Sequence, residues 1–279
     1  MSDCPHDPAA EGARMSFDGE MSYGDYLSLS QVLTAQHPVS QAHDEMLFII
    51  QHQTSELWMR LAVFELEAAR SALQAGRMGQ AFKVLTRVAR IFEQLNSAWD
   101  VLRTMTPSEY TAFRGDLAAS SGFQSHQYRQ IEFILGNRQP AMLKVHEHRP
   151  EWHGVLTEEL NRPSLYHVAL TMLFDRLRGA SVPEGLLQQD RPHSADDRVR
   201  ALWAEVYGDT TAHWQLYELA EKLVDLEDYF RRWRFNHVTT VERIIGFKRG
   251  TGGTSGVAYL RRMLEVELFP ELWHVRSDL

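Results

Sequence analysis

The chain has 279 residues, 44% of them hydrophobic and 24% charged, which is the ordinary mixture of a folded protein and excludes a disordered or collagen-like chain. Its formal net charge of −8 argues against general nucleic-acid binding, because phosphate neutralisation needs clustered Lys and Arg. The single cysteine, Cys4, excludes an internal disulfide, and no apolar run is long enough to cross a membrane, so we expect a cytoplasmic protein without a membrane partner.

The first twenty residues are polar and contain Pro5, Pro8, Gly12 and Gly19, which predicts a mobile leader over residues 1–20. Two aromatic residues, Tyr23 and Tyr26, follow the leader and form either a docking segment or a local hydrophobic staple. No later stretch has the composition of a linker between large domains, so residues 21–279 are predicted to form one domain.

Apolar residues at helical spacing dominate the rest of the chain. The spacing and the end signals predict helices over residues 43–73, 78–102, 123–135, 163–177, 195–206 and 210–245. A further helix is indicated by Thr106 and Glu109, which form a capping box with Pro107 at the first helical position. Alternating Val-, Ile- and Thr-rich stretches are missing, so the predicted class is all-α, with long antiparallel helices around a core site.

Two histidines lie on long predicted helices among bulky apolar residues. His237 follows Trp233 by four residues and continues the apolar stripe of the last long helix, so it is expected to point into the core. His52 follows Phe48 by four residues and shares a helix face with it. Each is either an ordinary core histidine or a metal or haem ligand, and spacing does not decide whether the two face each other.

Two other groups of residues have chemical potential. Tyr110 and Arg114 share a helix face and either grip a carboxylate or lie on a solvated surface. Residues 246–256 contain five glycines, and this loop is neither a Walker A loop nor a dinucleotide fingerprint. Its glycines favour an anion-binding nest or a lid over a site, against a plain turn between helices.

Several blocks of the sequence resemble the tryptophan 2,3-dioxygenase family. They are residues 43–58, 106–110, 113–114, 121–125, 233–235 before His237, and 246–256. The resemblance implies an all-α fold related to that of indoleamine dioxygenases, a noncovalent b-type haem in each subunit, and a homotetramer. It implies an enzyme that inserts O2 across the indole C2–C3 bond of L-tryptophan to give N-formylkynurenine, the first step of the kynurenine route.

The resemblance also implies a role for each matching residue. His237 would be the axial ligand of the haem iron, and His52 the catalytic histidine near the indole nitrogen. Phe48 would pack on the indole, with Ile49, Ile50 and Gln51 completing that segment. Tyr110 and Arg114 would hold the substrate carboxylate, and Thr251 its ammonium group. From a neighbouring subunit, the site would receive Tyr23, Tyr26 and Leu27.

Two other classes of protein are compatible with an all-α chain. A di-metal carboxylate oxygenase would need Glu-x-x-His on two helices, and this spacing occurs only once in the chain, at Glu271 and His274. A non-catalytic haem carrier or gas sensor would need neither the pair Tyr110 and Arg114 nor the glycine loop.

Overall fold

The computed structural model describes residues 7–279 and divides into two compact units, one ending at Val39 and one comprising Ser40–Leu279. The first six residues, with Cys4 and the start of the predicted leader, lie outside the described residues. The leader over 1–20 and the single domain over 21–279 stay predictions.

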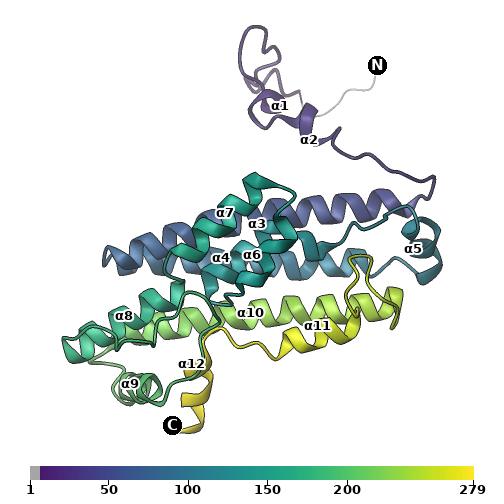
Figure 1. Cartoon of the computed structure of the whole chain (residues 1–279). Helices are drawn as coiled ribbons and strands as arrows, with labels where there is room; N and C mark the ends of the chain where they lie inside the picture. Colours follow the sequence, from purple (N-terminus) through teal and green to yellow (C-terminus); the bar gives the residue numbers. More distant parts are fainter. Residues whose placement is uncertain (1–6) are drawn as a thin grey trace. The chain divides into compact units, whose positions relative to one another are not determined.

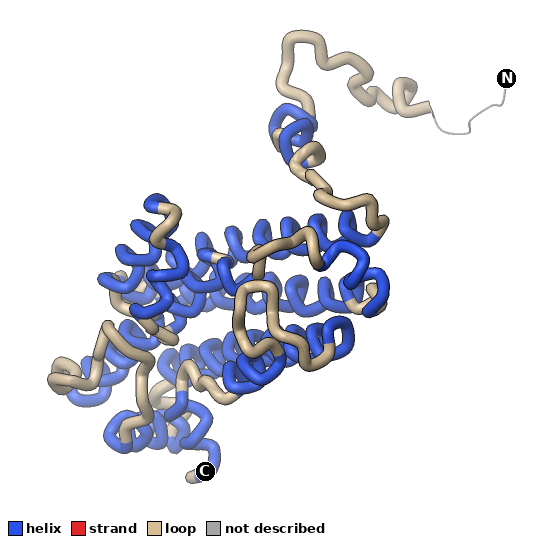
Figure 2. The backbone as a smooth tube through the Cα atoms, turned by 45° about the vertical axis from the view of Figure 1, so that its right-hand side comes forward, coloured by secondary structure: helices blue, strands red, loops and turns tan. Residues whose placement is uncertain are grey.

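Helices are the regular structure of both units, and residues 7–279 contain no strand (Figures 1 and 2). The predicted all-α class is therefore confirmed. The helices are α1 (Tyr23–Tyr26), α2 (Leu29–Val32), α3 (Asp44–Gln74), α4 (Met78–Leu102), α5 (Pro107–Arg114), α6 (His126–Leu135), α7 (Pro150–Asn161), α8 (Leu165–Arg178), α9 (Asp197–Gly208), α10 (Trp214–Ile245), α11 (Val257–Leu264) and α12 (Pro270–His274), with short 3-10 helices at Gly122–Gln124, Pro140–His146 and Val275–Ser277.

The long helices begin and end close to their predicted positions, because local signals define their ends. The capping box of α5 forms, with the Thr106 backbone N–H donating to Glu109 Oε2 at 2.6 Å. Gly136 ends α6 in the left-handed conformation, and Gly246 ends α10 at a φ of 66°.

Helices α7, α11 and α12 were not predicted. Each is short, and tertiary contacts rather than a long apolar period stabilise them. In α7, buried Glu159 accepts a hydrogen bond from Arg70 Nη2 of α3 at 3.0 Å. Before α12, the buried carboxylate of Glu227 accepts from the backbone N–H groups of Leu268 and Phe269 at 2.8 and 2.9 Å. Buried charged side chains therefore hold these segments in place, although charged residues are normally expected at the surface.

The core of the larger unit forms where α3, α4 and α10 pack along one another (Figure 1). The predicted stripe on α10 is buried, with Leu219, Leu223, Leu226 and Phe230 at 0% exposure. Trp233 is only partly buried, because beyond it the same face of α10 turns to a cavity. The stripe of α10 is therefore fully buried up to Phe230, and beyond Phe230 the helix contributes to the wall of a site.

The smaller unit has little core of its own. No residue between 7 and 39 is buried, and Tyr23 and Tyr26 on α1 are 76% and 75% exposed. A capping box between Ser22 and Asp25 sets the start of α1.

None of the helices in the described part of the chain is long and apolar enough to span a membrane.

Candidate active site

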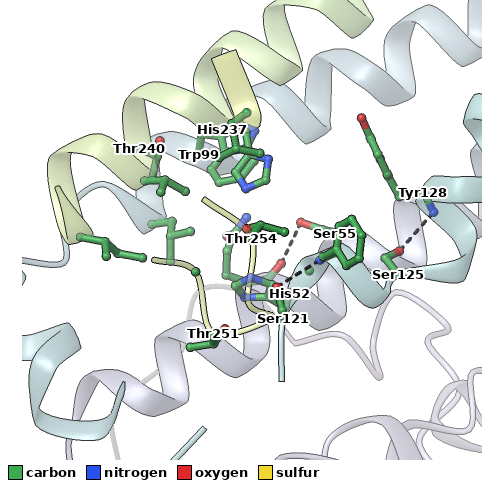
Figure 3. Close-up of a pocket in the computed structure, with 18 of the residues that line it drawn as sticks. His52, Ser55, Trp99, Ser121, Ser125, Tyr128, His237, Thr240, Thr251 and Thr254 are labelled. Atoms are coloured by element: carbon green, nitrogen blue, oxygen red, sulfur yellow. Dashed lines mark hydrogen bonds between the residues drawn. The ribbon is translucent and has the colours of Figure 1, made fainter. Parts of the chain in front are cut away.

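A large cavity lies in the unit of residues 40–279, between α3, α6, α10, α11 and the loops that precede α6 and α11 (Figure 3). Its walls are mostly apolar and aromatic, with a few polar groups. Of the predicted site residues, it brings together Phe48, Gln51, His52, Tyr110, His237 and Thr251. Such a lining suits a flat, largely apolar ligand held by a few polar contacts.

His237 faces the cavity from α10. Its imidazole stacks on the Trp99 indole, with ring centroids 5.1 Å apart and planes at 19°, and Trp233 packs beside it at 5.4 Å. Burial, with a smaller contribution from His52, lowers the pKa of His237 to about 4. At this pKa the ring is neutral at pH 7, and one of its nitrogens carries a lone pair that can bind a metal.

His52 faces the cavity from α3, and Figure 3 shows it on the wall that α3 forms, away from His237 and Trp99. Its Nδ1 lies 2.7 Å from the Phe48 backbone carbonyl, which can only accept, so Nδ1 carries the hydrogen. The Phe48 ring packs against the imidazole with centroids 4.1 Å apart. Burial lowers the pKa of His52, although the Phe48 carbonyl and the Glu56 carboxylate oppose the shift. The neutral ring therefore has Nε2 as an acceptor.

Tyr110 and Arg114 lie on one face of α5, as predicted. Tyr110 lines the cavity, and Arg114 lines an adjoining pocket that also contains Tyr110. Arg114 Nη2 donates to the Arg249 backbone carbonyl at 2.6 Å, whereas its Nε is buried without a hydrogen-bond partner within residues 7–279. A buried, unsatisfied guanidinium N–H is costly unless an anion pairs with it, so this pair suits a carboxylate.

The glycine loop lies against the segment before α6. Thr251 Oγ1 donates to the Ser120 carbonyl at 2.6 Å, and Arg249 accepts from Arg114. A Cβ added at Gly252 would lie 2.8 Å from Ser121 Cβ, and one at Gly256 would lie 2.5 Å from the Lys248 carbonyl oxygen. Glycine is thus needed at both positions, because the loop backbone packs directly on its neighbours.

Gly252→Ala is expected to displace the loop from Ser121 and to raise KM for the ligand about tenfold, which corresponds to a roughly 1.4 kcal/mol loss of binding. Steady-state kinetics measure the change. In the double variant Ser121→Gly/Gly252→Ala, residue 121 lacks the Cβ with which the new Cβ at residue 252 would clash. This variant should therefore recover part of the lost binding. A Gly252→Ala enzyme with unchanged KM would show that the close packing at Ser121 has no part in binding.

A buried ionic network in the wall of the cavity was not predicted. Glu132 on α6 bonds Arg129, accepts from Arg234 Nη2 at 2.9 Å and accepts from Asn137 Nδ2 at 2.9 Å. Arg234 also donates to the carbonyls of Met263 and Val266 at 3.1 and 3.2 Å. The network joins α6, α10 and the end of α11, and so fixes the wall that carries His237.

Besides Arg114, five predicted site residues do not line the cavity. Ile49 and Ile50 lie on α3 outside its lining, and Ile50 is 47% exposed. Tyr23, Tyr26 and Leu27 belong to the smaller unit and are exposed there. Their assigned roles stay predictions.

Comparison with known proteins gives a single answer for the whole chain. A family model described as tryptophan 2,3-dioxygenase matches residues 8–180 and 181–279. The chain belongs to the tryptophan 2,3-dioxygenase family. Curated proteins named tryptophan 2,3-dioxygenase from Ruegeria pomeroyi and Ruegeria sp. strain TM1040 are 69% and 64% identical to it, over 98% and 100% of this chain and 99% and 100% of their own lengths. A protein of the same name from Cupriavidus necator is 59% identical over 96% of this chain and 91% of its own length.

The tryptophan 2,3-dioxygenase family implies a haem cofactor, and the donor set of the cavity fits one. His237 is a neutral imidazole, the usual form of an axial ligand. Within residues 7–279 no group of three or more His, Cys, Asp or Glu side chains could hold a metal ion. A metal bound through His237 would therefore take its other ligands from outside the chain, as the iron of a haem does, and the aromatic walls suit such a flat group.

Proposed function

We propose that this dioxygenase binds a noncovalent b-type haem through His237 and converts L-tryptophan and O2 to N-formylkynurenine in the cavity between α3 and α10. The observation that carries the proposal is the placement of two neutral imidazoles, His52 and His237, on different walls of one aromatic cavity. Bound haem would supply the activation of O2, whereas the residues of the chain bind, orient and desolvate the substrate.

His52 orients the indole. With Nδ1–H directed to the Phe48 carbonyl, Nε2 accepts a hydrogen bond from the indole N–H of tryptophan. The Phe48 ring, which contacts His52, Tyr110 and Phe113, offers an apolar face to the indole. These two groups hold the indole C2–C3 bond in one orientation. Holding a reactant in the orientation that the reaction needs accelerates the reaction.

The polar end of tryptophan fits the part of the site formed by Tyr110, Arg114 and Thr251. Arg114 and Tyr110 provide N–H and O–H donors for the carboxylate, with Nε of Arg114 still unpartnered in the described residues. Thr251 offers a hydroxyl oxygen to the ammonium group. The loop that carries Thr251 is tied to Ser120 and Arg114, so substrate binding and exclusion of water occur together.

Self-association completes the proposal. We assign Tyr23, Tyr26 and Leu27 to the active site of a neighbouring subunit in a homotetramer, because a segment without buried residues exposes three apolar side chains there. Ile49, Ile50 and Gln51 complete the substrate segment of α3. A cytoplasmic location is proposed from the use of one cysteine in 279 residues.

One experiment tests the function against its alternatives. The purified protein is scanned for a Soret band, reduced, and mixed with L-tryptophan and air while formylkynurenine is followed by absorbance. A Soret band with product formation supports the proposal. Iron without a Soret band would favour a di-metal oxygenase, and haem without turnover would favour a carrier or sensor.

The pH dependence of activity should reflect the protonation of the His52 imidazole. Its pKa is lowered from 6.5, so the ring stays neutral at pH 7 and is protonated only when the pH falls through the lowered value. Protonation places a hydrogen on Nε2 and removes the acceptor for the indole. We therefore expect kcat/KM to stay level as the pH falls through 6.5 and to decrease about tenfold per unit only below the lowered pKa. His52→Ala should be less active throughout and should lack this acid limb; an acid limb that persists in the variant belongs to another group.

A further inference from the structure

Two clusters of polar side chains join α4 to α10 around the contact between Trp99 and His237. In the first cluster, Asn236 Nδ2 donates to Asn96 Oδ1 at 2.9 Å, and Asn96 Nδ2 donates to the Tyr229 carbonyl at 3.1 Å. Neither asparagine lines the cavity, and the proposed mechanism gives neither of them a role. The first cluster therefore ties the residue that precedes His237 to α4 from outside the cavity.

The second cluster lies further along both helices. Arg103 Nε donates to Thr240 Oγ1 at 2.8 Å, and Arg103 Nη2 also bonds Thr239. The same Nη2 lies 3.3 Å from Asn236 Oδ1. Asn236 thus belongs to both clusters, because its amide nitrogen donates to α4 and its amide oxygen accepts from α4. With both polar ends bonded, this side chain fixes the turn of α10 that carries His237.

Trp99 lies between Asn96 and Arg103 on α4. The three residues are spaced by 3 and 4, so they share the face of the helix that meets α10. On that face the Trp99 indole stacks on the His237 imidazole with planes at 19°, and Figure 3 shows the two rings together, next to Thr240. Within residues 7–279, Trp99 Nε1 is buried without a hydrogen-bond partner. The orientation of the indole therefore depends on packing, and this packing depends on how α4 is held against α10.

A histidine holds a metal firmly when neighbouring groups fix the direction of its ring. We propose that Asn96 and Arg103 are positioning residues for His237. By bonding the residues on either side of His237 in α10, they keep this helix in the register in which Trp99 stacks on the imidazole. The inference rests on the proposed haem ligation and deepens it, because it assigns the orientation of the ligand to two residues of α4 that do not line the cavity.

Loss of the first cluster should accelerate the dissociation of haem. Asn96→Leu/Asn236→Leu replaces both partners by apolar side chains of similar shape, so that neither partner is left unpaired by the other. The ferric holoenzyme of this variant should lose haem to excess apomyoglobin about tenfold faster than the wild type. The reason is that partners which orient a metal ligand are worth about 10- to 100-fold in metal affinity. Circular dichroism checks that the helix content is unchanged.

Tyr229→Phe is the matched control. The Tyr229 hydroxyl accepts from Arg90 Nη1 at 3.4 Å, which also joins α4 to α10 but lies two turns before His237. This variant should lose haem at the wild-type rate. If the double leucine variant does not fold, Thr240→Val takes its place. It keeps the shape of the side chain, removes the acceptor of Arg103 Nε, and should accelerate haem loss about fivefold.

Free imidazole separates the positioning of His237 from general support of the cavity. In His237→Ala supplied with imidazole, the ligand is not attached to α10, so Asn96→Leu/Asn236→Leu should change the rate of haem loss less than about twofold. An acceleration of about tenfold in both backgrounds would overturn the positioning role, as would haem loss at the wild-type rate when His237 is present. A wild type without a Soret band would overturn the proposed function itself, so the two failures are distinguishable.

Discussion

His237→Ala is expected to lose axial ligation of haem and, with it, dioxygenase activity. His237 is the imidazole that the α10 wall presents to the cavity, and it is neutral at pH 7. Partners that only orient a metal ligand are worth about 10- to 100-fold in metal affinity, so loss of the ligand should lower haem affinity by more than about 100-fold. Titration of the purified apoprotein with haem, followed at the Soret band, measures this loss. Free imidazole should partly restore the spectrum by filling the space left beside Trp99.

His146 provides the matched control. It is fully buried, and burial together with nearby cationic groups lowers its pKa to about 4, as for His237. It does not line the cavity. His146→Gln should therefore bind haem as the wild type does, which separates loss of a ligand from loss of a buried imidazole. An unchanged Soret band in His237→Ala would refute the assignment.

The sequence predicted what depends on local spacing. Helix periodicity predicted that His237 points into the core and that His52 shares a face with Phe48, and end signals located the start of α5 and the end of α6. Periodicity could not show that α3 and α10 present these histidines to one cavity, because that depends on how the helices pack. The resemblance of residue blocks supplied this pairing, and the cavity lining agrees with it.

The parts that were not predicted share a physical cause. Arg129 and Glu132 are spaced as an ordinary surface ion pair, yet both are buried and join α6 to α10 through Arg234. In the sequence, Trp99 is indistinguishable from the aromatic residues of the core. Its stacking on His237 depends on how α4 and α10 cross. Burial of charged and aromatic side chains is decided by tertiary packing, which local pattern does not encode.

Arg114→Ala is expected to raise KM for L-tryptophan by about 30- to 4000-fold. Truncation of one partner of a desolvated charge pair costs about 2–5 kcal/mol, and each 1.4 kcal/mol is tenfold. Arg114→Lys keeps the charge without the forked donors and should recover part of the loss. Tyr110→Phe removes one neutral donor and should cost about tenfold.

Arg114 has a second role that the experiment must separate, because its Nη2 also ties down the glycine loop through the Arg249 carbonyl. The distinguishing measurement is the ratio of kcat/KM for tryptophan to that for tryptamine, which lacks the carboxylate. If Arg114 binds the carboxylate, this ratio should collapse in Arg114→Ala, because only tryptophan loses a partner. If Arg114 only holds the loop, both substrates should lose activity equally and the ratio should stay at its wild-type value. A carboxylate role thus predicts that the enzyme no longer discriminates tryptophan from tryptamine, whereas the loop contact alone predicts a lower rate with both. Gly252→Ala is the reference variant, because it displaces the loop while Arg114 is intact.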